Sequence, residues 1–318
     1  MDGLSRATLP TSLPPRQATL RSAIGCVGIG LHGGQRVHLT LQPAACDHGI
    51  AFRRSDLPGR PTVAARWDRV VDTRMCTVLA DGPARVGTVE HLMAALATAG
   101  VTNALIDVDG PECPILDGSA APFVFLIDCA GVRAQEESVA VVTPVRPVRV
   151  TQGAAWAELR PAIDPDLFDL SLTIAFDAAA IGTQSIRMAP SEATLRHDLI
   201  RARTFTLAGE VAQLRAAGLA RGGSLENAVV VDGARVLNPG GWRMADECVR
   251  HKALDVIGDL ALSGVALRGR FSGHCSGHAL NNQLLRALFD DAANWRRVET
   301  APLEAEIGTW RAGLSRAA

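Results

Sequence analysis

The sequence has no excess of charge of either sign and no long hydrophobic run. Lysine and arginine number 32 and aspartate and glutamate 33, which gives a formal net charge of −1. Nucleic-acid-binding proteins usually carry a basic surface, so we expect no nucleic-acid partner. No apolar stretch approaches the roughly 20 residues that a membrane-spanning helix needs, and residues 1–17 lack the continuous apolar core of a signal peptide. We therefore expect no stable insertion into a membrane.

The cysteines show no paired pattern. The chain has seven of them, an odd number, and no C-x-x-C pair. This usage is typical of reduced thiols in the cytoplasm and not of a disulfide framework. Apolar residues make up 47% and charged residues 20% of the 318 residues, an ordinary globular composition. We predict a soluble cytoplasmic protein, and at about 100–200 residues per domain the length suggests two domains.

Hydrophobic periodicity predicts an irregular mixture of helices and strands. Apolar residues at helical spacing predict helices over 88–98 and 246–262, and alternation predicts a strand over 36–41. Thr88 is the expected N-cap of the first helix. Asp-Gly at 232–233, between two apolar runs, is typical of a β-hairpin. Irregular alternation of this kind favours an α+β fold over a regular parallel array.

The chain turns polar around residues 135–138, and we place a domain boundary there. We predict a disordered N-terminal tail over 1–16 and a C-terminal tail over 301–318. Between them we predict a first domain over 17–136 and a second over 137–300.

His251 and Asp255 form the most informative pair of polar residues. Their i, i+4 spacing places both on one helix face, about 6 Å apart along the axis, within reach of one zinc ion. Asp259 lies one turn further on the same face, where it could orient an imidazole or ammonium group. On most helices such a pair is solvated or takes part in capping, so this motif leaves both interpretations open.

Glu90 and His91 could supply the rest of a hydrolytic centre. A zinc hydrolase needs three protein ligands, an open position for water and a carboxylate that takes the proton of that water. His91 would complete a ligand set of two histidines and an aspartate, and Glu90 would be the general base. Equally, Glu90 could interact with the helix dipole while His91 is a core histidine.

Two further histidines, His274 and His278, stand in a glycine-rich loop before a predicted helix. One of them could be a general acid or a cation that stabilises an oxyanion. For His274 we favour a role in the turn itself, with asparagines satisfying the backbone. Cys248 and Cys275 lie near these histidines in sequence and could be soft ligands, but neither has a second cysteine at ligand spacing. We rank them below the histidine and aspartate set.

Seven segments carry a family resemblance. In chain order they are Val27-Gly-Ile-Gly-Leu-His-Gly33, Thr88-Val-Glu-His-Leu-Met-Ala-Ala-Leu96, Leu116-Asp-Gly-Ser-Ala-Ala-Pro122, Arg201-Ala-Arg-Thr-Phe205, Gly222-Gly-Ser-Leu-Glu-Asn227, Val249-Arg-His-Lys-Ala-Leu-Asp-Val-Ile-Gly-Asp-Leu260 and Ser276-Gly-His-Ala-Leu-Asn-Asn282. With them the chain closely resembles the UDP-3-O-acyl-N-acetylglucosamine deacetylases, zinc amidases of lipid A biosynthesis. The resemblance extends over roughly residues 16–295.

The resemblance implies a metal centre with one catalytic Zn²⁺, or Fe²⁺ in the cell. The ligands would be His91, His251 and Asp255, drawn from both halves of the chain. Glu90 would be the general base that activates water. His278, and not His274, matches the catalytic histidine of the family.

The resemblance also implies roles around this centre. Asp259 would hold the catalytic histidine in the needed tautomer and charge state. Thr204 would stabilise the oxyanion of the tetrahedral intermediate. Lys252, Phe205 and Phe176 would bind the substrate.

The fold implied by the resemblance is α+β, with two similar two-layer domains packed together. The second would carry a strand–helix–strand insert, about 206–237 here, that forms an acyl passage. The implied reaction is hydrolysis of the N-acetyl group of UDP-3-O-acyl-N-acetylglucosamine, the committed step of lipid A biosynthesis, by a cytoplasmic enzyme that we expect to be monomeric. The chain departs from the family pattern around Phe176. In many relatives an acidic residue stands before this phenylalanine and His-Pro follows shortly after it, whereas here the run is Ala175-Phe-Asp-Ala-Ala-Ala180.

Two alternatives stay open from the sequence. The same ligand set would serve another zinc amidase or esterase acting on a related acylated sugar. A non-enzymatic binder of nucleotide sugars or lipids would instead use the histidines for structure.

Overall fold

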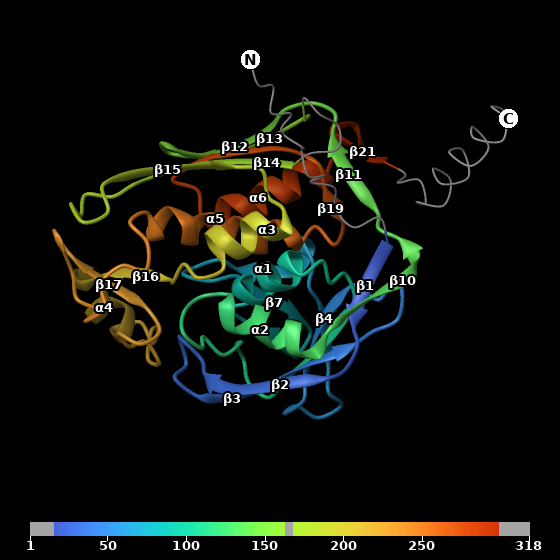
Figure 1. Ribbon diagram of the computed structural model, residues 1–318, viewed down its shortest axis with the longest axis horizontal. Coiled ribbons are helices and arrows are strands. Elements are labelled where there is room, and N and C mark those ends of the chain that lie inside the picture. The colour runs from blue at the N-terminus through green and yellow to red at the C-terminus, as the bar shows by residue number, and fades with distance from the viewer. Residues whose placement is uncertain (1–15, 163–167, 299–318) are drawn as a thin grey trace, which may run out of the picture.

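The computed structural model describes residues 16–162 and 168–298. Two large sheets form the outer layers, and the long helices α1 (Glu90–Thr98), α5 (Glu247–Ala261) and α6 (His278–Phe289) lie between them (Figure 1). The predicted α+β class, with two layered units packed together, is confirmed. Within the described ranges no helix is long and apolar enough to span a bilayer.

The first sheet comes from the N-terminal half of the chain. Its strand order is β2 (Ile24–Ile29), β3 (Arg36–Pro43), β9 (Ala104–Val108), β4 (Ile50–Arg54) and β5 (Thr62–Ala64). Strands β9 and β4 run parallel, and the other neighbours are antiparallel. In β3, Val37, Leu39 and Leu41 are buried while Arg36 and His38 are exposed. The predicted alternation of polar and apolar residues is thus confirmed, and it is the pattern of a strand in a sheet that packs one face against the core.

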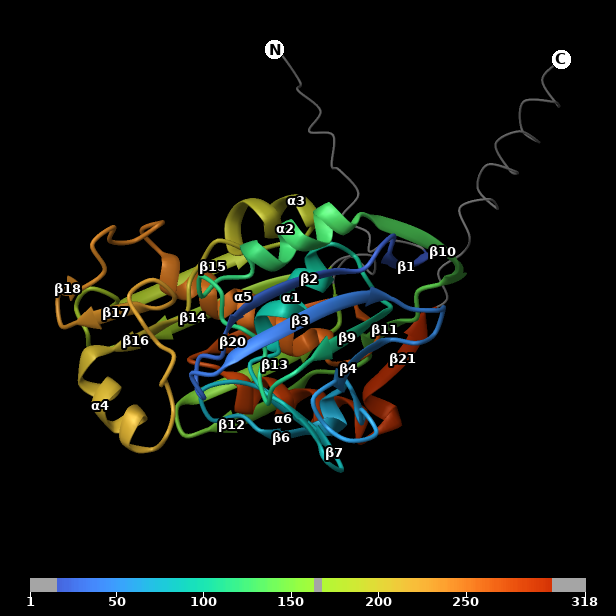
Figure 2. The same cartoon turned by 90° about the horizontal axis from the view of Figure 1, so that it is seen from below.

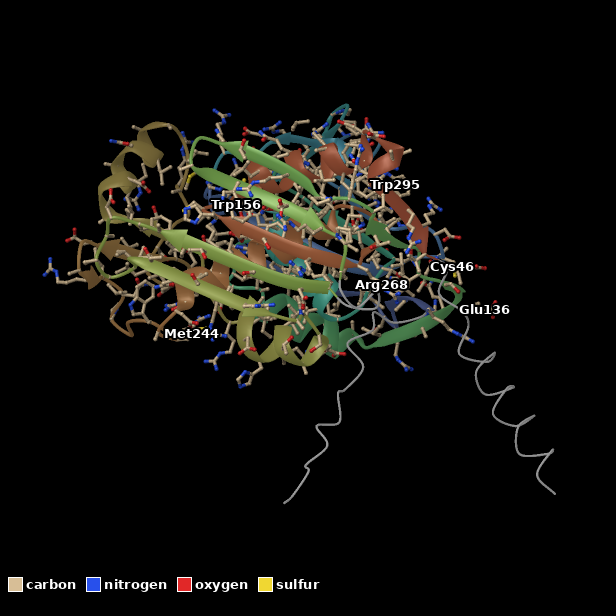
Figure 3. All side chains as sticks on the ribbon, turned by 90° about the horizontal axis from the view of Figure 1, so that it is seen from above. Cys46, Glu136, Trp156, Met244, Arg268 and Trp295 are labelled. Atoms are coloured by element: carbon tan, nitrogen blue, oxygen red, sulfur yellow. The ribbon has the colours of Figure 1, made fainter. Side chains whose placement is uncertain are left out.

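The second sheet repeats the pattern of the first. Its strand order is β12 (Val148–Gln152), β13 (Ala155–Arg160), β20 (Gly269–His274), β14 (Phe168–Ala175) and β15 (Thr183–Met188). Here β20 and β14 are the parallel pair and the other neighbours are antiparallel. Figure 3 looks onto the outer face of this sheet, where the Arg149 guanidinium lies 4.0 Å from the ring centroid of Trp156.

Smaller sheets and short helices complete the two units. They are β1 (Arg16–Leu20) with β10 (Val132–Ser138); β6 (Val70–Asp72), β7 (Val78–Asp81) and β8 (Ala84–Val86); β11 (Val141–Pro144), β19 (Ala266–Leu267) and β21 (Trp295–Val298); and the helices α2 (Ala121–Ala130) and α3 (Glu192–Thr194). The predicted boundary between residues 136 and 137 falls within β10, and Arg16 already belongs to β1. The rest of the two predicted tails, 1–15 and 301–318, lies outside the described residues.

A separate three-stranded sheet lies at one end of the molecule (Figure 2). It contains β16 (Phe205–Leu207), β17 (Val229–Asp232) and β18 (Arg235–Val236), and helix α4 (Ala208–Ala216) connects the first two strands. The predicted hairpin at 232–233 is the turn between β17 and β18. The insert predicted from the resemblance covers most of this unit.

The start of α1 differs from the prediction. The N-cap position is Val89, without a side-chain cap, and Thr88 has a positive φ of 53°. Thr88 was expected to cap the helix, and its hydroxyl instead contacts the Glu112 carboxylate at 3.4 Å. A left-handed conformation is costly for a β-branched residue, so the surrounding contacts hold this turn, which immediately precedes Glu90.

Three glycines allow the backbones of the two halves to touch. A Cβ at any of them would stand 2.1–2.2 Å from a backbone oxygen of the other half. The pairs are Gly222 with Gly30, Gly118 with Asn227, and Gly258 with Glu90. The last of these is the crossing of α1 over α5, and it brings the two candidate ligand helices together.

Candidate metal centre and active site

Helices α1 and α5 present the predicted ligands to one another. The ligand atoms of His91, His251 and Asp255 all lie within 4.8 Å of each other, and all three residues are buried. Nε2 of His251 is 3.5 Å and Nε2 of His91 is 3.8 Å from Oδ1 of Asp255. The two imidazole rings meet edge to face, with centroids 5.0 Å apart. The structure therefore brings together residues that are 164 positions apart in the sequence (91 and 255).

The bonding around Asp255 and His251 fits a divalent metal ion. Oδ1 of Asp255 is buried and accepts no hydrogen bond from the described part of the chain, while Oδ2 accepts one from Nζ of Lys252 at 2.8 Å. Nδ1 of His251 lies 3.0 Å from the carbonyl oxygen of Ala202. Because a carbonyl oxygen can only accept, Nδ1 must carry the proton of this hydrogen bond. Nε2 is then left with its lone pair, as a metal ligand requires.

The protonation states point the same way. Burial, together with the neighbouring His251, lowers the pKa of His91 to about 3, and burial lowers the pKa of His251 as well. Burial alone would raise the pKa of Asp255, but the charges of His251 and Lys252 outweigh it and hold that pKa below its ordinary value. Two neutral imidazoles and one carboxylate form a donor set that Zn²⁺ accepts.

Glu90 lies beside these ligands at the start of α1. It is 3% exposed, and its pKa rises to about 7 because of burial, with the charge of His278 opposing and those of Asp255 and Asp259 adding to the rise. The backbone N–H of Thr77 donates to Oε2 at 3.0 Å. A carboxyl with a pKa near neutrality is well suited to take up a proton.

His278 and Asp259 form a hydrogen-bonded pair opposite Glu90. Nδ1 of His278 lies 2.8 Å from Oδ2 of Asp259, and Nε2 of His278 lies 4.0 Å from Oε1 of Glu90. Burial alone would lower the pKa of His278, but the Asp259 and Glu90 carboxylates raise it to about 9. The raised pKa favours the protonated imidazole, whose Nε2 then has a proton to donate.

Thr204 lies on the second half of the chain, against the first. Its backbone N–H donates to the carbonyl of Gly118 at 2.8 Å, and its own carbonyl accepts from the N–H of Val229. Next to it, Phe205 stacks edge to face on Phe176 and on His251, with centroid distances of 5.4 and 6.3 Å.

These groups surround a cavity of about 520 Å³. Of the ten predicted site residues, eight line it: Glu90, His91, Thr204, Phe205, His251, Lys252, Asp255 and His278. Asp259 stands behind His278, and Phe176 packs behind Phe205. Cys275 also lines the cavity, but neither it nor Cys248 belongs to the ligand cluster found among the described residues.

Sequence reasoning missed several residues that hold the site. Either Asn281 or Asn282 was expected to satisfy backbone groups, but Asn281 donates its side-chain amide to Oδ2 of Asp259 at 2.8 Å. The hydroxyl of Thr77 donates to Oδ1 of the same aspartate. Glu247, one turn before His251 on α5, forms a buried ion pair with Arg203 at 2.8 Å. No spacing rule marks these residues, because their partners come from distant parts of the chain.

Comparison with known proteins agrees with this geometry. The family model described as UDP-3-O-acyl N-acetylglycosamine deacetylase matches residues 17–290. The chain belongs to this deacetylase family. Curated relatives named UDP-3-O-acyl-N-acetylglucosamine deacetylase include one from Acidithiobacillus ferrooxidans, 48% identical over 90% of this chain and 94% of the relative. The relative from Phenylobacterium zucineum is 47% identical over 88% of this chain and 95% of its own length. The relative from Myxococcus xanthus is 45% identical over 94% of this chain and 95% of its own length.

Membership identifies the chain as a hydrolase that removes an acyl group from nitrogen, and as a metal-dependent one. All seven described segments of the resemblance lie within the matched range of residues 17–290. Every residue that lines the cavity also lies within that range.

Proposed function

We propose that the chain hydrolyses the N-acetyl group of UDP-3-O-acyl-N-acetylglucosamine to the free amine and acetate, the committed step of lipid A biosynthesis. The proposal rests on family membership and on one observation above others. A buried set of two histidines and an aspartate, a carboxyl of raised pKa and an imidazole of raised pKa face the same cavity. A ligand set, a base and an acid are the parts that metal-assisted amide hydrolysis requires.

His91, His251 and Asp255 would hold the ion, and we propose Zn²⁺. When bound, Zn²⁺ lowers the pKa of water toward about 7 and polarises a carbonyl oxygen. Glu90 takes the proton as water attacks the acetyl carbon. The Thr204 hydroxyl donates a hydrogen bond to the oxygen on which negative charge develops, which stabilises the tetrahedral intermediate.

His278 completes the reaction on the other side of the amide. Its protonated Nε2 donates to the sugar nitrogen as the carbon–nitrogen bond breaks, so that the amine leaves in neutral form. Asp259 accepts from Nδ1 and keeps the proton to be donated on Nε2. The 4.0 Å between Nε2 and Oε1 of Glu90 supports an arrangement with base and acid on the two sides of one small group.

The substrate's lipid and nucleotide parts would extend beyond the metal. We propose that the unit of β16, α4, β17 and β18 takes the acyl chain, since Phe205 lines the cavity at the start of β16. Leu225 and Leu237 of this unit are each 42% exposed and offer apolar surface to such a chain. Lys252 supplies a positive charge in the cavity, because Asp255 holds its pKa above the ordinary value although burial acts against it.

We place the enzyme in the cytoplasm as a monomer. All seven cysteines are free thiols in the structure, in keeping with a reducing compartment. The UDP group of the proposed substrate supports the same location.

The experiment compares the wild type with Glu90→Gln, using exposed Glu192→Gln on α3 as a matched control. Glu90→Gln should retain metal and lose about 10²- to 10⁴-fold in kcat, the usual contribution of a general base. Glu192→Gln should be unchanged. His251→Ala should lose both metal and turnover. If the wild type holds metal but leaves this substrate intact, the substrate assignment is wrong and another amidase or esterase activity is favoured. If Glu90→Gln keeps full activity, Glu90 is not the general base.

A further inference from the structure

Thr77 binds two different catalytic carboxylates at once. It precedes β7 and is 1% exposed. Its backbone N–H donates to Oε2 of Glu90 at 3.0 Å, and its hydroxyl donates to Oδ1 of Asp259 at 2.7 Å. Glu90 lies on α1 and Asp259 on α5, 182 positions from Thr77 along the chain. One residue thus connects the two halves of the site.

The contact with Asp259 completes a fully occupied carboxylate. Oδ2 accepts from Nδ1 of His278 and from the amide of Asn281, both at 2.8 Å, and the Thr77 hydroxyl occupies Oδ1. With both oxygens bound, the carboxylate cannot rotate without breaking a buried hydrogen bond, which is costly. The plane of Asp259 in turn sets the direction in which Nε2 of His278 points.

The contact with Glu90 selects the oxygen that faces the reaction. Oε2 is bound by the N–H of Thr77, so Oε1 is the oxygen that faces Nε2 of His278, 4.0 Å away. Thr77 itself is not among the residues that line the cavity. It can therefore act only through its two partners.

We propose that Thr77 is a positioning residue that fixes the separation between the proton acceptor Glu90 and the proton donor His278. The inference rests on the proposed roles of those two residues. A residue that only supplied a hydrogen bond to a buried carboxylate would contribute to folding stability. It would leave kcat, the rate at which bound substrate reacts, unchanged. A positioning residue changes kcat, because a reacting geometry displaced by a fraction of an ångström reacts more slowly.

The test is a graded series at Thr77. Thr77→Ser keeps the hydroxyl, Thr77→Cys offers only a weak donor, and Thr77→Val has the same shape without a donor; all keep the backbone N–H. The matched control is Thr98→Val on α1, which removes a similarly buried hydroxyl; within the described ranges its one hydrogen-bond partner is the carbonyl of Ala94. Each variant is assayed for kcat and KM on UDP-3-O-acyl-N-acetylglucosamine, for metal content and for urea stability.

We expect kcat to fall about 10- to 100-fold in Thr77→Val, part of the 10²–10⁴ that a general acid contributes. KM should stay within about twofold and metal content should be unchanged. Thr77→Ser should recover kcat to within about threefold, Thr77→Cys should fall between, and Thr98→Val should match the wild type. The proposal is overturned if Thr77→Val retains the wild-type kcat, if the serine variant is as slow as the valine variant, or if Thr98→Val is equally slow.

A second readout separates this proposal from the proposed function. In the metal-loaded protein, the Nδ1 proton of His278 bonded to Asp259 should give a low-field proton resonance, identified by its loss in His278→Ala. Thr77→Val should shift or broaden this resonance, and Thr98→Val should not. If the wild type fails to turn over the substrate, the function is wrong while this resonance still tests the positioning; a resonance identical in wild type and Thr77→Val would overturn the positioning alone. If the valine variant does not fold, the cysteine variant carries both measurements.

Discussion

Replacing Gly258 with alanine should separate the two helices that carry the proposed metal ligands. The new Cβ would lie 2.1 Å from the oxygen, 2.8 Å from the carbon and 3.1 Å from the Cα of Glu90. All three are backbone atoms, so no side-chain rotation relieves the contact. Ordinary contact begins near 3.4 Å, and the helices must therefore move apart by about 1 Å at the crossing. His91 moves with Glu90, away from the ligands on α5.

The expected loss is larger in function than in stability. Overpacking of this kind costs about 1–3 kcal/mol, while alanine in place of glycine within a helix gains about 1 kcal/mol, so the variant should lose no more than about 2 kcal/mol and remain folded. A displacement of about 1 Å at reacting groups can cost about 10²-fold in rate. Metal affinity should fall as well, because His91, the third proposed ligand, moves away from His251 and Asp255.

The assay measures kcat/KM, metal retained after dialysis and urea unfolding of Gly258→Ala. Its control is Gly209→Ala, which is also helical, in α4, and whose Cβ would meet nothing within 4 Å. The control should keep its full complement of metal and gain stability, because its new Cβ meets nothing. Gly258→Ala with kcat/KM within about threefold of the wild type and a full complement of metal would refute the reasoning.

Three further changes have directions set by the structure. Asp259→Asn removes a charge that raises the pKa of His278 to about 9, so the alkaline limb of the pH–rate profile, where His278 loses its proton, should move to lower pH by about one unit or more; an unmoved limb would contradict the assignment. Glu247→Ala leaves the guanidinium of Arg203 buried without its partner, and the free energy of unfolding measured in urea should fall by about 3–5 kcal/mol; a loss under 1 kcal/mol would be inconsistent with a buried pair. Removing metal with a chelator should lower the midpoint of thermal unfolding, since metal at 100 times its Kd adds about 2.7 kcal/mol, and re-addition should restore it.

The sequence predicted the elements that a local pattern controls. The predicted helix over 246–262 is α5, Glu247–Ala261, and the strand over 36–41 lies within β3. Both are long or strongly periodic, so a side chain's place follows from its neighbours in the chain. The start of α1 was predicted wrongly: Thr88 has a positive φ, and its hydroxyl contacts Glu112, 24 positions away, in place of the helix.

The candidate site shows the same division. Spacing on one helix indicated His251, Asp255 and Asp259, and left open whether any metal binds there. Only the fold, or a resemblance to a family, joins them to His91 on another helix. Thr77 was found by neither, because a single threonine before a short strand carries no pattern and its two partners lie on α1 and α5.

The backbone contacts at Gly222, Gly118 and Gly258 have a consequence for recombining this enzyme with its relatives. Where main chain meets main chain, backbone atoms and not side chains set the closest approach of the two halves. A hybrid that takes one half from a distant relative should align its ligands as long as the glycines and the loops around them are kept. These three glycines are therefore the first positions that such a hybrid must keep.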